Sequence, residues 1–586
     1  MFKSQIAAFL WLCYNVSMKE DLIKALSEAA AKAGVKDQNA AVLGYPENPE
    51  HGDFSSNIAM VHAKALKMNP KALAEKIVGE FSKDMPAIVS KVEIAGPGFI
   101  NLKLKDEAFV RAVLDNAPKR SSRSKKEKVM VEYTDPNPFK IFHIGHLMSN
   151  AIGESVSRLI EHSGVEVIRV CYQGDVGLHV AKTVWAVMHE DGAWEKLQKL
   201  KTVTEKVKFL GEMYVLGSSH DEEPSIQKEI VDINKKIFEK SDKDISEIYD
   251  YGRKVSLEYF DTVYARLGTK FDRFFFESDM ATHGLKIVEE FLKKGTFEKS
   301  EGAVVFKGEE HGLHTRVFIN SHGLPTYEAK ELGLNVEKFK LYPGLLRSVI
   351  VTGNEINEYF KVLKKVLSIV APAVAEKTDH IGHGMLRFSS GKMSSRKGNI
   401  ISAESLIEDV RAMVIEKMTD RKLPAAEENE IADAVAVAAI KYSVLRQAPG
   451  GDVIFDSSKS VSFEGDSGPY LQYAAVRANS VLEKARAEGM NVDAKPSKVP
   501  DAVGALERLL ARFADIADRA AREYAPQHIA GYLIDLAGAF NNFYANNQIV
   551  DSKEPLSQYR IALTKSFLAT MTEGLHLLGI KVPKKM

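Results

Sequence analysis

The fold is decided by residues 128–175, which read KVMVEYTDPNPFKIFHIGHLMSNAIGESVSRLIEHSGVEVIRVCYQGD. An apolar strand, KVMVEYT, is followed by a turn, a helical segment that ends near Gly164, and a second apolar strand, EVIRVCYQGD. Strand, helix and strand at this spacing predict a βαβ crossover, and the parallel sheet that it implies is buried on both faces. We therefore expect an α/β fold class with a doubly wound parallel sheet.

The segments that come next extend this domain to residues 129–402. Residues from about 180–260 are charged and have a helical pattern, which indicates an insertion rather than more sheet. Short apolar runs return at 302–308, 316–320 and 346–353. We expect all three to be strands of the doubly wound sheet.

The flanking regions have different patterns. Residues 18–116 alternate amphipathic helices with short strands, which predicts a separate α+β domain, and residues 1–17 are expected to be an extension of it. Residues 117–128 are rich in Lys, Arg and Ser and predict a solvated basic linker. The rest of the chain is almost wholly helical, with a connecting region at 403–465 and a helical bundle at 466–586.

The composition limits the classes of function. The 586 residues are 45% hydrophobic and carry 79 Lys and Arg against 79 Asp and Glu, which excludes a disordered chain, collagen and a uniformly basic nucleic-acid coat. Two distant cysteines, Cys13 and Cys171, predict neither a disulfide framework nor a cysteine zinc site, and they favour a cytoplasmic setting. The apolar stretch Ile6–Val16 is far shorter than the ~20 residues of a membrane-spanning helix, so we expect no membrane partner.

The turn in the decisive stretch carries two histidines, His143 and His146, where the predicted helix begins. Backbone N–H groups and the helix dipole face a bound anion at such a position, and both imidazoles can donate hydrogen bonds to phosphate oxygens. Gly145 has no side chain, so a flat base can lie against the backbone there. A second H-x-G-H string, at 380–383, has a strand or loop pattern after it, so we expect a structural or supporting role for it.

A second candidate site is the segment GKMSSRKGN at 391–399, which has glycines near both ends, three cations and no acid. Such a loop can cover a triphosphate and neutralise the leaving pyrophosphate. Taken alone it is equally consistent with a solvated basic turn. Its occurrence together with the histidine motif favours the phosphate role.

The two motifs together resemble the HIGH and KMSKS signatures of class I aminoacyl-tRNA synthetases, and further segments narrow the resemblance to arginyl-tRNA synthetase. FEGDSGPYLQYA at 463–474 resembles that family's GxTGPYLQYA segment, and GDVG at 174–177 is similar to its GDWG. Residues 524–537 resemble its helical anticodon-binding domain. HGDFSSNIA at 51–59 and GPGFIN at 96–101 resemble its amino-terminal additional domain. The resemblance covers nearly the whole chain, in the family's order.

The resemblance implies a Rossmann-like catalytic domain, an α+β amino-terminal additional domain that binds tRNA, and an all-α carboxy-terminal anticodon-binding bundle. It also implies roles for individual residues. The expected catalytic residues are His143, His146, Lys140, Lys392 and Arg396. The expected arginine-binding residues, which include carboxylates able to pair with a guanidinium, are Glu132, Asn137, Tyr327, Glu331 and Glu355. The expected ATP-binding residues are Gly145, His143, His146, Gly174, Asp175, Lys392 and Met393.

The sequence departs from the family pattern at two positions. Glu331 stands where the family's Y-x-x-x-D motif usually has Asp, so its side chain is one methylene longer. Ser395 replaces the second lysine of KMSKS, and the resemblance implies that Lys140 substitutes for that lysine. The substitution is electrostatically reasonable, because one cation can replace another if it reaches the same phosphate oxygens.

The resemblance implies an arginine–tRNA ligase, which activates L-arginine to arginyl-adenylate with ATP and transfers it to the 3′ end of tRNA(Arg) during translation. ATP with Mg²⁺ is expected, with no zinc or other protein-held metal, and the expected oligomeric state is a monomer. The alternatives are another class I synthetase, such as the zinc-using cysteinyl enzyme, a small-molecule adenylyltransferase, and a non-catalytic tRNA-binding relative. The long helical carboxy-terminal part argues against an adenylyltransferase, and the intact histidines argue against a non-catalytic protein.

Overall fold

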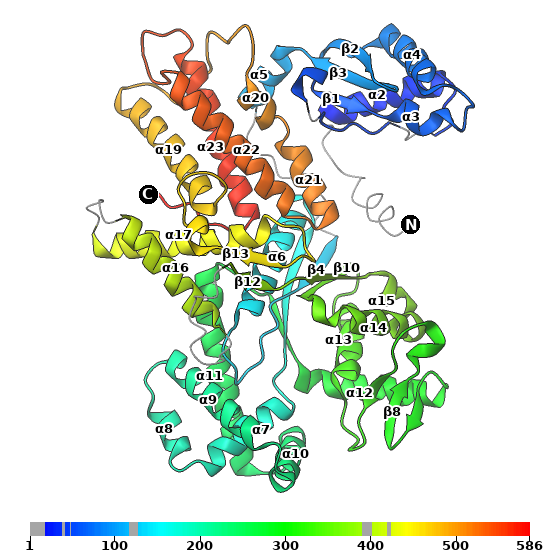
Figure 1. The fold of residues 1–586 in the computed structure, drawn as a ribbon, viewed down its shortest axis with the longest axis vertical. Helices are drawn as coiled ribbons and strands as arrows, with labels where there is room; N and C mark the ends of the chain where they lie inside the picture. Colours follow the sequence, from blue (N-terminus) through cyan, green and yellow to red (C-terminus); the bar gives the residue numbers. More distant parts are fainter. Residues whose placement is uncertain (1–17, 38–40, 47, 116–126, 390–400, 419–423) are drawn as a thin grey trace. The chain divides into compact units, whose positions relative to one another are not determined.

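A computed structural model describes residues 18–37, 41–46, 48–115, 127–389, 401–418 and 424–586 (Figure 1). The predicted extension at 1–17 and most of the predicted linker at 117–128 lie outside the described residues. Contacts within the chain divide it into two compact units. The first unit comprises residues 1–123, 474–518 and 532–573, and the second comprises residues 124–473, 519–531 and 574–586.

A parallel five-stranded sheet forms the centre of the second unit, with the strand order β11-β10-β4-β5-β6. Its strands are β4 (Lys128–Glu132), β5 (Glu166–Gln173), β6 (Arg273–Phe276), β10 (Leu345–Gly353) and β11 (Thr378–His383). The chain fills the sheet outward from β4 in one direction and then from β10 in the other. The order therefore reverses between β4 and β10, which confirms the doubly wound fold class and marks the crevice where such sheets bind ligands.

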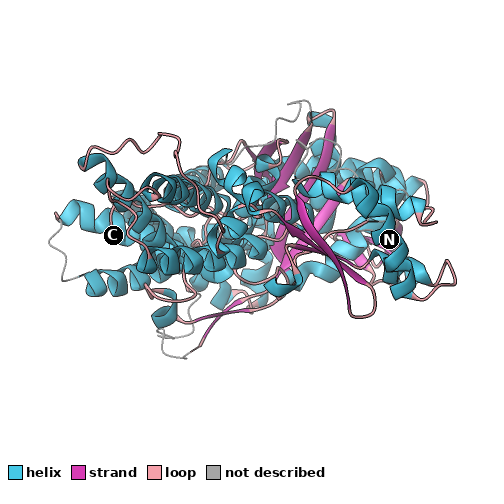
Figure 2. Cartoon of the chain, turned by 90° about the horizontal axis from the view of Figure 1, so that it is seen from above, coloured by secondary structure: helices cyan, strands magenta, loops and turns pink. Residues whose placement is uncertain are grey.

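Helix α6 (Ile144–His162) makes the crossover from β4 to β5 and is buried on nearly every side. Small residues allow this close packing. Gly153, for example, lies directly against the Tyr133 ring, where even a Cβ atom would overlap the ring. Figure 2 shows the strands lying among the helices. The other helices around this sheet are α12 (Glu277–Lys293), α13 (Tyr327–Leu341), η4 (Asn354–Ile356), α14 (Asn357–Val370) and α15 (Pro372–Glu376).

The segment expected to be a helical insertion consists of five helices between β5 and β6. They are α7 (Leu178–His189), α8 (Ala193–Lys199), α9 (Val203–His220), α10 (Pro224–Glu239) and α11 (Lys243–Leu267). Their apolar faces share a core that includes Val184, Leu210 and Ile233. Phe139, from the turn after β4, is buried in the same core, so the insertion is packed directly against the turn that carries the histidines.

The prediction that three later strands extend the parallel sheet is wrong for two of them. Strands β8 (Ala303–Phe306) and β9 (Arg316–Ile319) form a separate antiparallel sheet with β7 (Glu298–Ser300). Glu301 and Gly302 both have positive φ, 48° and 81°, and make the tight turn that joins β7 to β8. A turn of this length can join only antiparallel strands, because parallel neighbours need a long crossover.

The rest of the second unit includes helices that pack against α6. It contains β12 (Leu386–Phe388) paired with β13 (Val453–Phe455), η3 (Gly308–His311), α16 (Ala403–Met418), α17 (Ala425–Leu445) and α18 (Ser457–Ser460). Residues from the end of the chain complete it. Ser155 of α6 donates a hydrogen bond from Oγ to the Leu577 carbonyl at 2.8 Å, and the buried Lys441 donates from Nζ to the Gly579 carbonyl at 2.8 Å.

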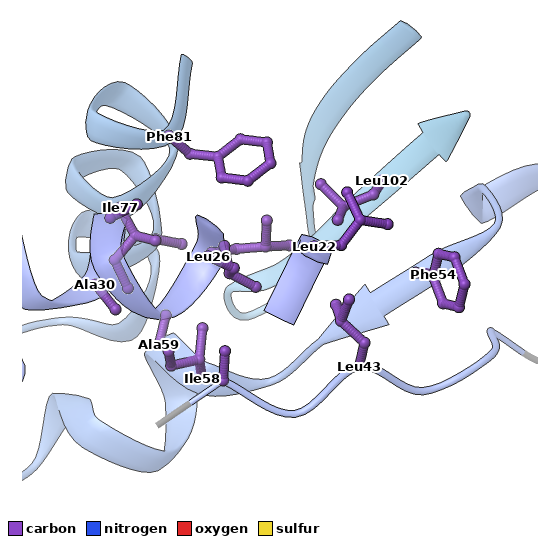
Figure 3. Packing of buried hydrophobic residues seen from close by; sticks show 14 of the residues in the cluster. Leu22, Leu26, Ala30, Leu43, Phe54, Ile58, Ala59, Ile77, Phe81 and Leu102 are labelled. Atoms are coloured by element: carbon purple, nitrogen blue, oxygen red, sulfur yellow. The ribbon is translucent and has the colours of Figure 1, made fainter. Parts of the chain in front are cut away.

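The first unit contains an α+β domain near the amino terminus of the chain. Its elements are α2 (Met18–Lys32), η1 (Pro49–His51), β1 (Phe54–Ser56), α3 (Ile58–Ala63), α4 (Pro70–Phe81), η2 (Ser82–Asp84), β2 (Val89–Ala95), β3 (Phe99–Leu104) and α5 (Asp106–Asp115). The sheet is antiparallel, in the order β1-β3-β2. Leu22 and Leu26 of α2, Phe81 of α4 and Leu102 of β3 are buried in one core (Figure 3).

Helices dominate the carboxy-terminal part of the chain. They are α19 (Gly468–Ala487), α20 (Ala505–Leu510), α21 (Phe513–Glu523), α22 (Gln527–Asn546) and α23 (Ser557–Leu577). Within the first unit, Arg508 of α20 joins the α+β domain through ion pairs with Asp53 and with Asp106, the latter at 2.7 Å. In the described part of the chain, no helix combines the length and the apolar character needed to span a bilayer.

Candidate active site

The carboxyl ends of β4 and β10 hold the candidate site, because the sheet order reverses between them. Glu132 is the last residue of β4, and β10 ends at Gly353, two residues before Glu355 in η4. His143 immediately precedes α6. Glu355 lies close enough to His143 to raise the pKa of that imidazole, although burial and Lys140 lower it by more. The predicted residues of three separate segments thus meet at one edge of the sheet.

The turn between β4 and α6 is held in an unusual backbone conformation. Thr134, Asp135 and Phe139 have φ values of 82°, 45° and 67°, each of which is costly for a residue other than glycine. Buried hydrogen bonds fix this turn. The Thr134 amide donates to Ser149 Oγ at 2.9 Å and the Phe139 amide donates to Ser256 Oγ at 2.9 Å. Packing against α6 and α11 therefore offsets the conformational cost of these positive φ values, as is typical of a functional turn.

The two histidines form the first turn of α6. His143 is the helix cap, and its Nδ1 accepts hydrogen bonds from the amides of Gly145 at 3.1 Å and His146 at 3.3 Å. His146 Nδ1 in turn accepts from the His143 amide at 3.3 Å. The rings stack with centroids 3.5 Å apart. Since both Nδ1 atoms are acceptors, each neutral imidazole carries its proton on Nε2, where it can be donated to a ligand.

Burial keeps both imidazoles in this neutral form. It lowers the pKa of His143, with Lys140 adding to the effect. The pKa of His146 lies well below its ordinary value, first because of burial and then because of His143 and Lys140. Lys140 thus lies within electrostatic reach of both rings. The arrangement offers two fixed N–H donors beside one ammonium group, which suits phosphate oxygens.

The segment that follows the second cationic motif in the chain is bonded to the histidine turn. Lys392, Met393 and Arg396 lie outside the described residues. The described chain resumes at Ile401, whose carbonyl accepts a hydrogen bond from the Ile144 amide at 3.2 Å, and the Ala403 amide donates to the Phe142 carbonyl at 2.8 Å. The segment directly after the cationic motif is therefore bonded to the histidine turn.

One face of α13 lines a buried chamber beside Glu132. Tyr327, Glu331, Asn335 and Lys338 occupy positions i, i+4, i+8 and i+11, which share one side of a helix. Lys338 Nζ lies 2.6 Å from Glu132 Oε2, and the side chains of both are essentially inaccessible to solvent. Asn335 donates to Glu331 Oε1 at 3.0 Å. Glu132 and Glu331 are each only 1% exposed.

The chamber contains more buried acid than base. Asp135 lies within electrostatic reach of Glu132 and Glu331, and burial followed by Glu132 raises its pKa well above the ordinary range. Burial and then Glu132 also raise the pKa of Glu331 to about 8, although Lys338 opposes the shift. Glu277 also acts on Glu331 and is paired with the buried Lys330, so four carboxyl groups in this region face two ammonium groups, Lys338 and Lys330. A buried site with this surplus is suited to a cationic ligand.

Several polar atoms in the chamber have no hydrogen-bonding partner in the protein. These buried atoms are Glu331 Oε2, Asn335 Oδ1, Tyr172 OH and Tyr359 OH. Glu331 contributes to the raised pKa values of both tyrosines, after burial for Tyr359 and after burial and Glu277 for Tyr172. Unpaired buried acceptors are costly unless a ligand or water satisfies them. A planar guanidinium with five N–H donors would satisfy several at once.

The predicted residues Asn137, Gly174 and Asp175 lie on the β5 side of the site. The Asn137 side-chain oxygen packs against Gly174 so closely that a Cβ atom at Gly174 would overlap it. Asp175 is fully buried, and its carboxylate is paired with Arg253 Nε at 2.9 Å and with the Ser278 amide at 2.9 Å. Asp175 therefore fixes the backbone beside Gly174 and has no open face toward a ligand.

The second H-x-G-H string lies on β11, as its sequence pattern predicted, and not at the start of a helix. His380 stacks on Phe360 with ring centroids 3.8 Å apart and hydrogen-bonds to Thr352 Oγ1 at 2.7 Å. His383 hydrogen-bonds to the Gly384 carbonyl at 2.7 Å. Stacking and a hydrogen bond thus hold the His380 imidazole within the sheet, and a hydrogen bond holds that of His383.

Sequence reasoning missed several members of the chamber: Asp135, Tyr172, Asn335, Lys338 and Tyr359. The helical spacing from Tyr327 and Glu331 was a usable signal for Asn335 and Lys338, because both lie on the same predicted helix face. The signal for Asp135 was its position just after the strand that ends at Glu132, because a carboxylate there lies at the carboxyl edge of the sheet. No sequence pattern pointed to Tyr172, because its position opposite α13 depends on how the sheet packs. Among the described residues, no group of three His, Cys, Asp or Glu side chains is placed to hold a metal ion.

Three comparisons with known proteins agree with this geometry. The family described as tRNA synthetases class I (R), catalytic domain, matches residues 109–457. The arginyl tRNA synthetase N terminal domain matches residues 17–104, and the DALR anticodon binding domain matches residues 471–586. The boundaries of these matches follow the chain order expected from the motifs.

Individual relatives span almost the entire chain. The arginine–tRNA ligase of Lactobacillus johnsonii is 29% identical over 94% of this chain and 97% of its own length. That of Halothermothrix orenii is 26% identical over 97% of this chain and 100% of its own. The solved structure of Thermus thermophilus arginyl-tRNA synthetase superposes with a TM-score of 0.80 at 24% identity, over 97% of this chain and 100% of that one. This last likeness establishes that the fold is shared.

Proposed function

The chain belongs to the family of class I tRNA synthetases (R), and from this we infer that it is an arginine–tRNA ligase. It activates L-arginine with ATP to arginyl-adenylate and then transfers the arginyl group to tRNA(Arg). The observation that carries the assignment is the buried chamber of Glu132, Asp135 and Glu331, where these carboxyl groups and the neighbouring Glu277 outnumber the ammonium groups of Lys338 and Lys330. A chamber of this kind favours a cationic side chain and disfavours neutral ones.

The arginine side chain is proposed to enter the chamber with its guanidinium facing Glu331. Tyr327 and Tyr359, whose rings lie 5.0 Å apart, form an apolar wall for the side-chain methylenes. Glu132 is already paired with Lys338, so we propose that it sets the charge of the chamber rather than receiving the guanidinium alone. We propose that Asn137 lies near the α-amino group of the bound arginine and that Glu355 lines the same pocket.

The adenylate-forming step is proposed to occur beside the histidine turn. The arginine carboxylate attacks the α-phosphate of ATP, the bond to the leaving pyrophosphate breaks, and no protein nucleophile is needed. His143 and His146 would donate from Nε2 to phosphate oxygens as negative charge develops there. Lys140, Lys392 and Arg396 would neutralise the pyrophosphate.

ATP is proposed to lie beside Gly145 and Gly174, which have no side chains of their own; Asn137 packs against Gly174 and the His143 ring against Gly145. Met393, from the cationic motif, would contact the base. Asp175 would act indirectly by holding the Gly174 backbone, because its own oxygens are taken by Arg253 and Ser278. Mg²⁺ would accompany ATP with phosphate and water oxygens as its ligands, which is common for this ion.

The two domains of the first unit are proposed to bind tRNA, and the match of residues 471–586 to an anticodon binding domain supports this. By resemblance to the family, we also propose a cytoplasmic monomer.

A charging assay with matched amino acids tests the assignment. The purified chain, with ATP and tRNA(Arg), is offered arginine, lysine and citrulline, the last of which copies the shape of arginine without its charge. We expect charging with arginine alone. Charging with citrulline would show that the carboxylates do not select charge, and charging with another amino acid would overturn the specificity. If nothing is charged while tRNA still binds, the chain is a non-catalytic relative.

A further inference from the structure

Lys140 is held by a residue from the helical insertion. Its Nζ lies 4.3 Å from the centroid of the Tyr214 ring, in the middle of α9. This distance is that of a cation–π contact, in which an ammonium group is attracted to the face of an aromatic ring. Lys140 lies within electrostatic reach of both His143 and His146. Tyr214 therefore contacts the candidate phosphate-binding group directly, although it is distant in sequence from every motif of the site.

Tyr214 lies between two contacts of α9 with other elements. Gly211, three residues earlier, faces Ile141, with an ordinary van der Waals distance of 3.8 Å between an added Cβ atom and Ile141 Cγ2. Gly217, three residues later, lies against the Lys182 carbonyl of α7, where an added Cβ atom would overlap the backbone. Gly217 thus allows α9 to approach α7 closely, and α9 meets the histidine turn beside Gly211.

The surroundings of Tyr214 are cationic. Burial raises the pKa of the Tyr214 phenol, but Lys140 and then further nearby groups, Lys182 among them, outweigh burial and lower it overall. Lys182 is itself paired with Asp221 at 2.7 Å. The neighbouring His179 is kept neutral by burial and by Lys140, and it hydrogen-bonds to the Gly174 carbonyl at 2.9 Å. Lys140 has no carboxylate partner among the described ion pairs, so its ammonium group stays available to a phosphate.

We propose that Tyr214 is a positioning residue for ATP activation: its ring holds the Lys140 ammonium group beside His143 and His146, so that the helical insertion forms part of the catalytic machinery. This inference rests on the proposed function and goes beyond it, because it assigns a role to a residue outside all the motifs. An ammonium group on a flexible four-carbon side chain loses conformational freedom when it binds a phosphate. A ring that restrains it beforehand reduces that loss.

A double-mutant cycle between Lys140 and Tyr214 tests the proposal. Charging of tRNA(Arg) is measured at saturating arginine and tRNA with ATP varied, for Tyr214→Leu, Tyr214→Phe, Lys140→Met and the double variant. We expect Tyr214→Leu to lower kcat/KM for ATP by roughly three- to thirtyfold, the range of a partly desolvated cation–π contact. Tyr214→Phe keeps the ring and should lose less than about threefold. The KM for arginine should be unchanged in all of them.

The decisive comparison is the effect of Tyr214→Leu in the Lys140→Met background, where we expect less than about a twofold further loss, because there is no ammonium group left to position. An equal loss in both backgrounds would mean that Tyr214 only supports packing, and the proposal would be wrong. If Lys140→Met charges tRNA too slowly to assay, the same double-mutant cycle can be built from the affinity of each variant for α,β-methylene-ATP, measured by calorimetry. If Lys140→Met charges normally, the proposal fails while the arginine assignment stands.

The insertion supplies a matched control. Lys206 lies over the Tyr251 ring at 5.3 Å and donates a hydrogen bond to Tyr251 OH at 2.8 Å. This pair also joins a lysine to a tyrosine within the same group of helices, through the tyrosine hydroxyl instead of the ring face. Tyr251→Leu should leave kcat/KM for ATP unchanged within about twofold, since that lysine faces no part of the site. A loss as large as that of Tyr214→Leu would show that any damage to the insertion slows the enzyme, and it would refute the proposal.

Discussion

The variant Glu331→Gln tests whether the chamber is kept ready for a guanidinium at the expense of stability. Burial and Glu132 raise the pKa of Glu331 from an ordinary 4.5 to about 8. At pH 7 the free enzyme therefore holds a proton on this group in about nine molecules of ten. A guanidinium that pairs with the carboxylate lowers its pKa and expels that proton. Arginine binding should release close to one proton in the wild type and none in Glu331→Gln.

The size of the effect on arginine affinity follows from the burial of the site. Removal of one partner of a buried charge pair costs about 3–5 kcal/mol, which is a loss of roughly several hundredfold to several thousandfold. In the wild type, deprotonation opposes binding below pH 8, so arginine affinity should rise by up to about tenfold per pH unit between pH 6 and pH 8. Glu331→Gln should show weak binding with no such rise.

The stability of the free enzyme should change in the opposite direction. A carboxyl whose folded pKa is raised imposes no penalty below pH 4.5, and it destabilises the fold progressively as the pH rises through about 8. The full difference corresponds to roughly 5 kcal/mol. Glu331→Gln lacks this penalty and should resist urea better than the wild type at pH 8.5. Trp185 and Trp194 both lie in the helical insertion, and the third tryptophan is Trp11, so in a Trp11→Phe background tryptophan fluorescence reports on the unit that contains Glu331.

Calorimetry of arginine binding in two buffers with different ionisation enthalpies counts the protons released. Glu337→Gln is the control, because Glu337 lies on the same helix but pairs with Lys340 and His283, each at 3.3 Å. It should leave both affinity and proton count unchanged. The reasoning is refuted if Glu331→Gln binds arginine as the wild type does, if it still releases a proton, or if it is the less stable protein at pH 8.5.

Three further substitutions probe other parts of the structure. His143→Ala should lower the charging rate by about 10²–10³-fold while tRNA binding survives, because it removes one N–H donor at the developing charge. His380→Ala should lower the charging rate far less. An equal loss in the two variants would reverse the assignment of the two H-x-G-H strings. Lys338→Met leaves Glu132 buried without its cation and should lower the free energy of unfolding of the second unit by about 3–5 kcal/mol, measured by urea titration, whereas an unchanged midpoint would contradict the pairing. Arg508→Met breaks an ion pair with Asp106 and one with the buried Asp53, so it should cost about 1–3 kcal/mol in the first unit, and an unchanged thermal unfolding midpoint would contradict the pairing.

The sequence predicted the parts of the fold that depend on local pattern. The βαβ unit at 128–175 followed from strand and helix periodicity, and β11 was correctly separated from α6 by the pattern of the residues after each H-x-G-H string. The predicted role of β8 and β9 was wrong because strand propensity does not say which sheet a strand joins. The turn at Glu301 and Gly302 decides that, and its left-handed conformation is not evident when the strands alone are considered.

The candidate site was predictable where one motif carries it and less so where distant segments meet. The motif residues at the end of β4 and the start of α6 do lie together. The charge balance of the chamber could not be foreseen, because it depends on Lys338 reaching back across the packing interface to Glu132. Tyr214 was equally hidden, since its contact with Lys140 depends on how α9 packs against the histidine turn and against α7.

The contact between α6 and the end of the chain has a consequence for the order of events during synthesis. Ser155 and its hydrogen-bonding partner Leu577 are separated by 422 residues. At a translation rate of roughly 5–20 residues per second, α6 waits about 20–80 seconds on the ribosome for this partner to be made. During that time α6, the helix that follows His143, lacks the hydrogen bond between Ser155 and the Leu577 carbonyl. A chain whose synthesis stops before Leu577 would contain both histidines of this turn without that support, so it should be less stable than the full chain.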